Sequence, residues 1–281
     1  QEVRRGAAER EPDAELVRYP SRTYVFVAWN SRRPQLADRR VRRALTMATD
    51  RATAVEAVLQ GHARVADGTL PPFHWSDDPP GPTRPYGPVA AGALLTEAGW
   101  VDRDGDGVRE NTAGVPLEIT IKTLAGNAQR ADLAQVMQAQ LGEVGARVRV
   151  EVVEGATLMG QINDVAARDF DGVVLGLTVE FRLSDRDILH SDRLDGLYAW
   201  SGTDNPEIDR LIDAITVEVD RARATELWHE YQAVIQEEHP YTFLYYPDRL
   251  AGVSTRLRGI EMDTRGELLN LREWYLDPER R

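Results

Sequence analysis

Three aspartates alternate at Asp102, Asp104 and Asp106, and Gly107 follows them directly. Carboxylates at the first, third and fifth positions and a glycine at the sixth are the pattern of an EF-hand calcium loop. The twelfth position, where that loop needs a bidentate glutamate, is Ala113, and a strand-like run rather than a helix follows. Alternating Asp and Gly also form tight turns, because Asx side chains bond to the backbone and glycine permits positive φ. We therefore expect a structural turn, with a calcium site as the weaker alternative.

A second carboxylate, Glu180, comes just after an apolar, β-rich run at residues 170–177. Ligands of α/β proteins bind at the carboxyl ends of the strands. A lone carboxylate there either anchors an ammonium group or faces water. Asp185 and Asp187 lie nearby and leave a third alternative, in which one of them acts with Glu180 as the carboxylate pair of a hydrolase. An acidic cluster of this kind is more commonly a solvated face or a set of helix caps.

Large aromatic residues stand in polar, loop-like segments at Trp75, Tyr198 and Trp200. Such side chains often line ligand sites, and they equally often fill the core beneath loops. The five histidines form no pair at metal-ligand spacing, and the sequence contains no phosphate-binding glycine loop and no nucleophile elbow. The residues therefore indicate no enzyme, no cofactor and no resident metal, and do not by themselves name the class of protein.

Composition narrows the class of protein further. The chain has 281 residues, no cysteine and a net charge of −12. A surface this acidic repels nucleic acid, and the absence of cysteine excludes thiol catalysis and disulfides. No apolar run is long enough to span a membrane. Because the sequence begins with Gln, we expect a mature or trimmed chain.

Hydrophobic periodicity predicts an α/β protein with a charged, poorly ordered lead-in and a long proline-rich loop at residues 61–88. Strands that alternate with helices after residue 116 favour a largely parallel sheet. Helix starts are marked by Asp38 and Asp50 as N-caps. The expected strands lie at residues 23–29, 116–123, 146–153, 170–177, 241–246 and 250–253, and the expected helices at 38–48, 50–59, 89–98, 128–144, 157–167, 206–219 and 221–238.

The ordered string of these segments resembles the C-terminal half of the family 5 extracytoplasmic solute-binding proteins, the dipeptide, oligopeptide and nickel receptors of ABC transporters. The resemblance covers roughly residues 20–275. The segments that carry it are YVFVAWN (24–30), DRRVRRALTMATDR (38–51), PPFHW (71–75), ALLTEAGWVDRDGDGVREN (93–111), PLEITIKTLAGNAQR (116–130), RDFDGVVLG (168–176) and NPEIDRLI (205–212).

The resemblance also implies a binding site. Peptide-binding members carry a Gly-Trp-x-x-Asp segment whose Asp pairs with the ligand's ammonium, and here the segment reads Gly-Leu-Thr-Val-Glu at residues 176–180. Glu180 keeps the charge, while the missing Trp and the missing Asp-Pro leave the kind of solute open between peptides, other amines, sugars and metal chelates. The expected ligand-binding residues are Glu180, Thr178, Arg182, Tyr198, Trp200 and Trp75.

For the whole chain the resemblance implies a periplasmic-binding-protein-like (type II) lobe, with a mixed sheet flanked by helices and crossing strands to a second lobe that is missing. Residues 1–22 would be a disordered or trimmed lead-in, 23–250 the solute-binding lobe, and 251–281 a tail belonging to the other lobe's sheet. The expected role is extracytoplasmic capture of a peptide or small-molecule solute for ABC permease subunits, with no nucleic-acid partner. The alternatives are a ligand-sensing domain of a regulator and the carboxylate hydrolase.

Overall fold

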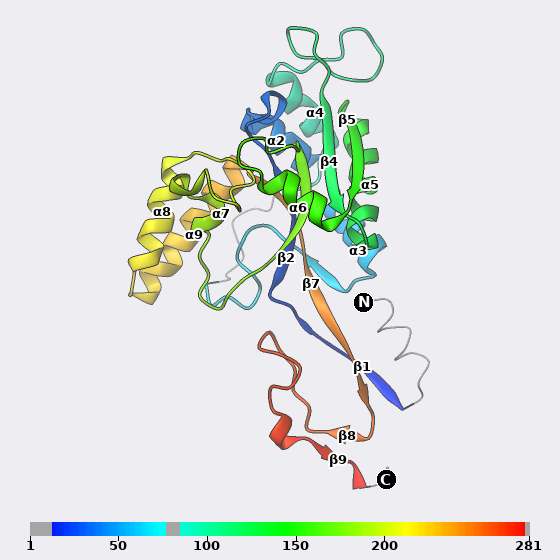
Figure 1. Ribbon diagram of the computed structural model, residues 1–281, viewed down its shortest axis with the longest axis vertical. Helices are drawn as coiled ribbons and strands as arrows, with labels where there is room; N and C mark the ends of the chain where they lie inside the picture. Colours follow the sequence, from blue (N-terminus) through cyan, green and yellow to red (C-terminus); the bar gives the residue numbers. More distant parts are fainter. Residues whose placement is uncertain (1–12, 77–84, 279–281) are drawn as a thin grey trace.

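One mixed sheet organises the chain in the computed structural model, which describes residues 13–76 and 85–278. Its strands follow the order β1-β7-β2-β6-β4-β5, and β3 pairs with β7 beside this path (Figure 1). The strands of this sheet are β1 (Ala14–Pro20), β2 (Thr23–Trp29), β3 (Ala63–Val65), β4 (Glu118–Leu124), β5 (Arg147–Val153), β6 (Gly172–Thr178) and β7 (Tyr241–Ser254).

Only part of this sheet is parallel, so the expectation of a largely parallel sheet is wrong, whereas the mixed sheet flanked by helices is confirmed. The β4 strand runs parallel to both β5 and β6. The β2 strand is antiparallel to β6 and to β7. The parallel strands are those joined by helical crossovers, as the sequence indicates, but β2 and β7 lie outside those crossovers and enter the sheet in opposite directions.

Helices cover both faces of the sheet because its central strands are apolar on both sides. Along β2, Val25, Val27 and Trp29 join one buried cluster, and Tyr24 and Phe26 join the other. The first cluster is covered by α2 (Arg39–Met47), α3 (Arg51–Leu59), α4 (Pro88–Glu97) and α5 (Ala128–Glu143). The second is covered by α6 (Gly155–Asn163), α7 (Arg186–Leu189), α8 (Pro206–Val217) and α9 (Arg221–Glu238).

Side-chain caps fix where several helices begin, as the sequence indicates. Asp38 accepts a hydrogen bond from the backbone N–H of Arg40, and Asp50 accepts one from that of Thr53. Each cap satisfies an amide that the first helical turn leaves unpaired. At its other end α3 stops at Gln60, which has a φ of 53°, the left-handed conformation common at helix ends.

A two-stranded arm extends from the body of the protein (Figure 1). It consists of β1 and the second half of β7, paired antiparallel from Ala14↔Ser254 to Pro20↔Asp248. Part of the expected disordered lead-in is therefore an ordered strand, because the charged segment contains side chains that pack on β7, such as Tyr19 against Ala251 and Val253. Residues 1–12 lie outside the described part of the chain. Beyond the arm lie β8 (Leu257–Arg258), η3 (Leu271–Glu273) and β9 (Tyr275–Leu276).

Short 3₁₀ turns, η1 (Pro34–Leu36) and η2 (Ser191–Arg193), complete the secondary structure of the described residues. The proline-rich loop of the sequence contains β3, and its residues 77–84 lie outside the described part. Within the described residues, no helix combines the length and apolar character needed to cross a bilayer.

Candidate functional site

The C-terminal end of β6, residues 178–182, presents the charged groups on which the sequence analysis centred. Glu180 follows the strand, and its side chain is 82% exposed. Its Oε2 lies 3.6 Å from Nη1 of Arg22, in the short link between β1 and β2. Next to this pair, the hydroxyls of Thr178 and Thr23 are 3.0 Å apart across the two strands. Thr178 and Glu180 therefore lie at one edge of the sheet, as predicted, while Arg182 is exposed just beyond them.

Two anchors hold the exposed segment that carries Glu180. At its start, the backbone N–H of Val179 donates to the carbonyl of Arg22 at 2.9 Å. At its far end, Asp185 is buried and accepts hydrogen bonds from the hydroxyl of Tyr231, at 2.8 Å, and from the side chain of Thr69. Burial raises the pKa of the Asp185 carboxyl.

The carboxylate pair of the hydrolase alternative does not form. Asp185 faces the core hydroxyls just described, while Glu180 faces water beside Arg22. Asp187 is 73% exposed and lies 3.6 Å from Arg193. Because the three carboxylates have different surroundings, the acid and base of a hydrolase are not brought together.

Aromatic side chains gather near Glu180. Phe181 is 55% exposed, and its ring packs edge-on against Phe73 with the ring centroids 6.1 Å apart. Trp75 follows in the same loop as Phe73, is 46% exposed, and has the guanidinium of Arg221 5.1 Å from its ring centroid. Trp75 thus belongs to the loop that reaches Phe181. The sequence analysis overlooked Phe181, although its place next to Glu180 was a usable signal.

Tyr198 and Trp200 lie elsewhere, which corrects the expectation that they share a face with Glu180. Arg32, just past the C-terminal end of β2, donates to the carbonyls of Ala199 and Trp200. Arg22 and Glu180 lie at the other end of β2, which is seven residues long and so spans roughly 23 Å. The Trp200 side chain is buried, and its ring packs against Phe26. Trp200 therefore fills the core beneath a loop, rather than lining a ligand site.

A half-buried cation, Arg130, was also overlooked. It lies in the first turn of α5, just after the C-terminal end of β4, and its guanidinium lies over Gly176 of β6, where any larger residue would collide with it. Arg130 forms a side-chain hydrogen bond with Tyr245, and burial lowers the pKa of Arg130 and raises that of Tyr245 to about 12. Among the described residues no carboxylate pairs with it. A guanidinium without an acidic partner is free to receive an anionic group.

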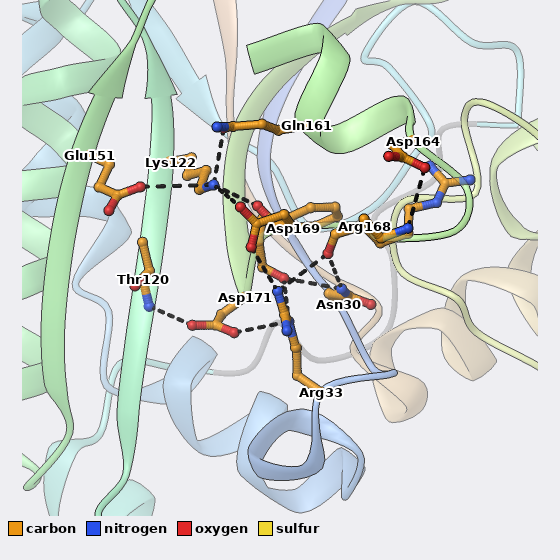
Figure 2. Close-up of polar contacts among 12 residues, drawn as sticks. Asn30, Arg33, Thr120, Lys122, Glu151, Gln161, Asp164, Arg168, Asp169 and Asp171 are labelled. Atoms are coloured by element: carbon orange, nitrogen blue, oxygen red, sulfur yellow. Dashed lines mark hydrogen bonds and ion pairs between the residues drawn. The ribbon is translucent and has the colours of Figure 1, made fainter. Parts of the chain in front are cut away.

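The N-terminal end of β6, residues 168–172, is closed by buried polar contacts (Figure 2). Lys122 of β4 is only 5% exposed. Its Nζ donates to the carbonyl of Asp169 at 2.6 Å, to the carboxylate of the same residue at 3.2 Å, and to Oε1 of Gln161 at 3.0 Å. The Lys122 amine lowers the pKa of the Asp169 carboxyl. These contacts join β4 and α6 to the segment that leads into β6.

Side chains from the segment after β2 complete this closure (Figure 2). Asn30 is buried, and its amide donates to the carbonyls of Arg168 and Phe170. Arg33 lies 3.2 Å from the Asp169 carboxylate and 3.3 Å from that of Asp171. Because Lys122, Asn30 and Arg33 all find partners within the described part of the chain, this end of β6 is a positioning network.

The aspartate-rich segment forms the expected turn. The carboxylate of Asp102 accepts from the backbone N–H groups of Gly105 and Gly107, and Asp106 lies 3.1 Å from Arg147. One oxygen each from Asp102, Asp104, Asp106 and Glu110 nevertheless lies within 4.8 Å of the others. Since backbone N–H groups and Arg147 already bond to carboxylates of this cluster, calcium binding stays the weaker prediction.

None of the recesses seen among the described residues is lined by Glu180. A recess of about 410 Å³ lies between α4 and α5, where Val89, Thr96 and Arg109 are among its lining residues. The C-terminal end of β6 instead presents an open surface that carries the Glu180 carboxylate, arginine side chains such as Arg22 and Arg182, and the exposed rings of Phe181 and Trp75. Aromatic rings combined with a few charged groups are typical of the linings of ligand sites.

The mixed sheet, the crossing strands and this charged edge define the chain as a lobe of a solute-binding protein. Residues 4–187 match the model of the bacterial extracellular solute-binding proteins, family 5. The chain therefore belongs to this family of extracellular binding proteins.

Individual relatives agree with this assignment. The chain is 34% identical to the oligopeptide-binding protein AppA of Bacillus subtilis over 96% of its own length and 50% of AppA. The structure of that AppA in complex with a nonapeptide superposes with a TM-score of 0.86, at 32% identity, over 98% of this chain and 55% of the other. A probable ABC transporter-binding protein of Deinococcus radiodurans is 30% identical over 49% of this chain and 24% of that protein. The chain thus spans about half the length of AppA, and its fold is the periplasmic-binding-protein-like lobe.

Proposed function

We propose that this chain is the C-terminal lobe of the substrate-binding component of an ABC importer, which captures a peptide or another amine-bearing solute outside the cytoplasm and delivers it to a membrane permease. The family assignment and the likeness to AppA support a peptide. The Deinococcus relative supports an ABC transporter rather than a regulator. Binding and delivery need neither a cofactor nor a catalytic residue.

One observation carries the proposal: the C-terminal end of the sheet's strands carries both an exposed carboxylate and a guanidinium that pairs with no carboxylate of the described residues. Glu180 and Gly176, over which Arg130 lies, are four residues apart, which an extended chain spans in at most about 14 Å. A zwitterionic peptide presents an ammonium and a carboxylate over a comparable distance. Glu180 would hold the ammonium and Arg130 the carboxylate, each through a charge-assisted hydrogen bond.

Capture would proceed by closure rather than by chemistry. The body meets the arm at the β1–β2 link and along β7, so the wall that carries Glu180 is joined to the arm by two crossing segments. A ligand held by this wall and by a second lobe would favour the closed arrangement, because only closure lets it contact both. Exclusion of water would then strengthen the ion pair at Glu180.

Binding of tri-alanine followed by NMR titration tests the proposal. A single wall should bind this probe weakly, with a Kd on the order of 1 mM. Glu180→Gln and Arg130→Gln should each weaken binding about tenfold, the size expected for one charge-assisted hydrogen bond. The control Asp187→Asn, an exposed carboxylate on the neighbouring segment, should bind as the original chain does.

N-acetyl-tri-alanine separates the roles of the two charges. It lacks the ammonium, so it should bind more weakly and equally to the original chain and to Glu180→Gln. If Glu180→Gln binds tri-alanine as well as the original chain does, the ammonium site is not at Glu180 and the proposal fails.

A further inference from the structure

Arg22 already occupies the carboxylate that the proposed function assigns to the ligand. It stands between β1 and β2, and its Nη1 lies 3.6 Å from Glu180 and 3.5 Å from the carbonyl of Val179. Its guanidinium carbon lies 4.9 Å from the ring centroid of Phe181. A carbonyl, a carboxylate and an aromatic face therefore surround one cation, and all three acceptors lie on consecutive residues.

This arrangement restrains Arg22 more than an ordinary surface pair would. The Arg22 side chain is 30% exposed, whereas that of Glu180 is 82% exposed. Stacking on an aromatic ring and a backbone bond fix the plane of a guanidinium, while the Glu180 side chain keeps its freedom. The backbone at Arg22 is also held, because its carbonyl accepts from Val179. The guanidinium of Arg22 therefore has a defined position beside any ligand that binds to Glu180.

We propose that Arg22 makes this site selective for an ammonium with a carbonyl or carboxylate oxygen beside it, the α-amino-acyl group, over a simple amine. This inference rests on the proposed function, since it presumes that Glu180 receives an ammonium. A simple amine must compete with Arg22 for Glu180, and it has no oxygen that could accept a hydrogen bond from the displaced guanidinium. An α-amino-acyl group supplies the guanidinium with a new acceptor.

The distances fit such a group. In an amino-acyl unit the nitrogen and its own carbonyl oxygen are about 3 Å apart by standard bond lengths. The Arg22–Glu180 separation of 3.6 Å is similar, so one group reaches both side chains. The ammonium donates to Glu180, and Arg22 donates to the ligand oxygen, so each charge keeps a partner.

Two small probes of similar size test the selectivity: L-alaninamide, which has an ammonium and a carbonyl, and n-propylamine, which has the ammonium alone. NMR titration of the original chain should show alaninamide bound about tenfold more tightly than propylamine. In Arg22→Gln the preference should fall to about twofold or less, chiefly because propylamine binds more tightly to an uncontested Glu180. Arg22→Lys keeps the charge without the planar fork and should show an intermediate preference.

The matched control is Arg18→Gln, which removes another ion-paired arginine, four residues earlier on the arm, away from Glu180. It should keep the tenfold preference. If Arg22→Gln keeps that preference while Glu180→Gln abolishes binding of both probes, the inference about Arg22 is overturned and the proposed function stands. If the original chain binds neither probe, or binds both regardless of Glu180, the proposed function fails and the inference fails with it.

Discussion

At the start of β6 the charged groups of Lys122, Asp169 and Arg33 are satisfied by the protein itself, whereas at the end of the same strand Glu180 is exposed and shared with a single arginine. The strand has only seven residues, so the two environments lie roughly 23 Å apart. We therefore expect polar residues at one end to contribute to stability, and the proposed function assigns those at the other end to a ligand. A charged residue is not a candidate for ligand binding because of its charge alone. It becomes a candidate when its charge is not already paired within the protein.

The largest effect that this comparison predicts is at Lys122. Lys122→Met keeps most of the apolar stem and removes the amine, so Gln161 and Asp169 each lose a buried donor. We expect the free energy of unfolding in urea to fall by about 3 kcal/mol. Arg149→Met, on the neighbouring strand and 72% exposed, is the control and should change it by less than about 0.5 kcal/mol. Equal stability of the two variants would refute the distinction between the ends of β6.

A smaller loss is expected at Asp185, the buried anchor of the exposed end. Asp185→Ala leaves the hydroxyls of Tyr231 and Thr69 without an acceptor and should cost about 2 kcal/mol in urea unfolding at neutral pH. Asp185→Asn keeps an acceptor oxygen and should cost less than the alanine variant. The reverse order would show that packing volume, rather than the hydrogen bonds, sets the role of Asp185.

The pH dependence of Asp185→Asn sharpens the same point. Burial raises the folded-state pKa of Asp185 above its ordinary 3.8, so the folded chain holds this proton more tightly than the unfolded chain does. The resulting contribution to stability is complete below pH 3.8 and is lost as pH rises through the folded pKa. As the pH rises from 3.8 through the folded pKa, Asp185→Asn should therefore lose less stability than the original chain. Parallel curves for the two proteins would contradict this.

The smallest effect on stability belongs to Glu180. Because its side chain is mostly exposed, Glu180→Gln should change the free energy of unfolding by less than about 0.5 kcal/mol. The same substitution should weaken tri-alanine binding about tenfold, so stability and binding respond to different ends of one strand. If Glu180→Gln and Lys122→Met unfolded equally readily, the two ends of β6 would not differ in their contribution to stability, and the comparison would be wrong.

Local signals predicted much of the fold. The aspartate caps and apolar faces located α2 and α3 to within about one residue, and the strand runs located β2, β4, β5 and β6 to within about two. The β1 strand was missed because it lies in a charged segment, and it is ordered by pairing with residues more than two hundred positions away on β7. Pairing between such distant segments is not visible in the periodicity of either one.

The position of Glu180 was predicted from a local signal, because this residue directly follows a recognisable strand; its role in binding stays a prediction. Tyr198 was placed with it wrongly, since the end of β2 on which each loop lies depends on the direction in which β2 and β6 pair. Arg22 and Arg130 were missed because an arginine has no distinctive local pattern; each is identified by the strand residues that it contacts.

Lys122 is also the only lysine in the sequence. The folded chain therefore keeps its single ε-amine away from solvent, and an acylating reagent should modify little beyond the terminal amine while the fold is intact. Any opening between β4 and α6 would expose that amine and add one mass label. A single natural residue thus reports local unfolding by mass spectrometry, with no engineered probe.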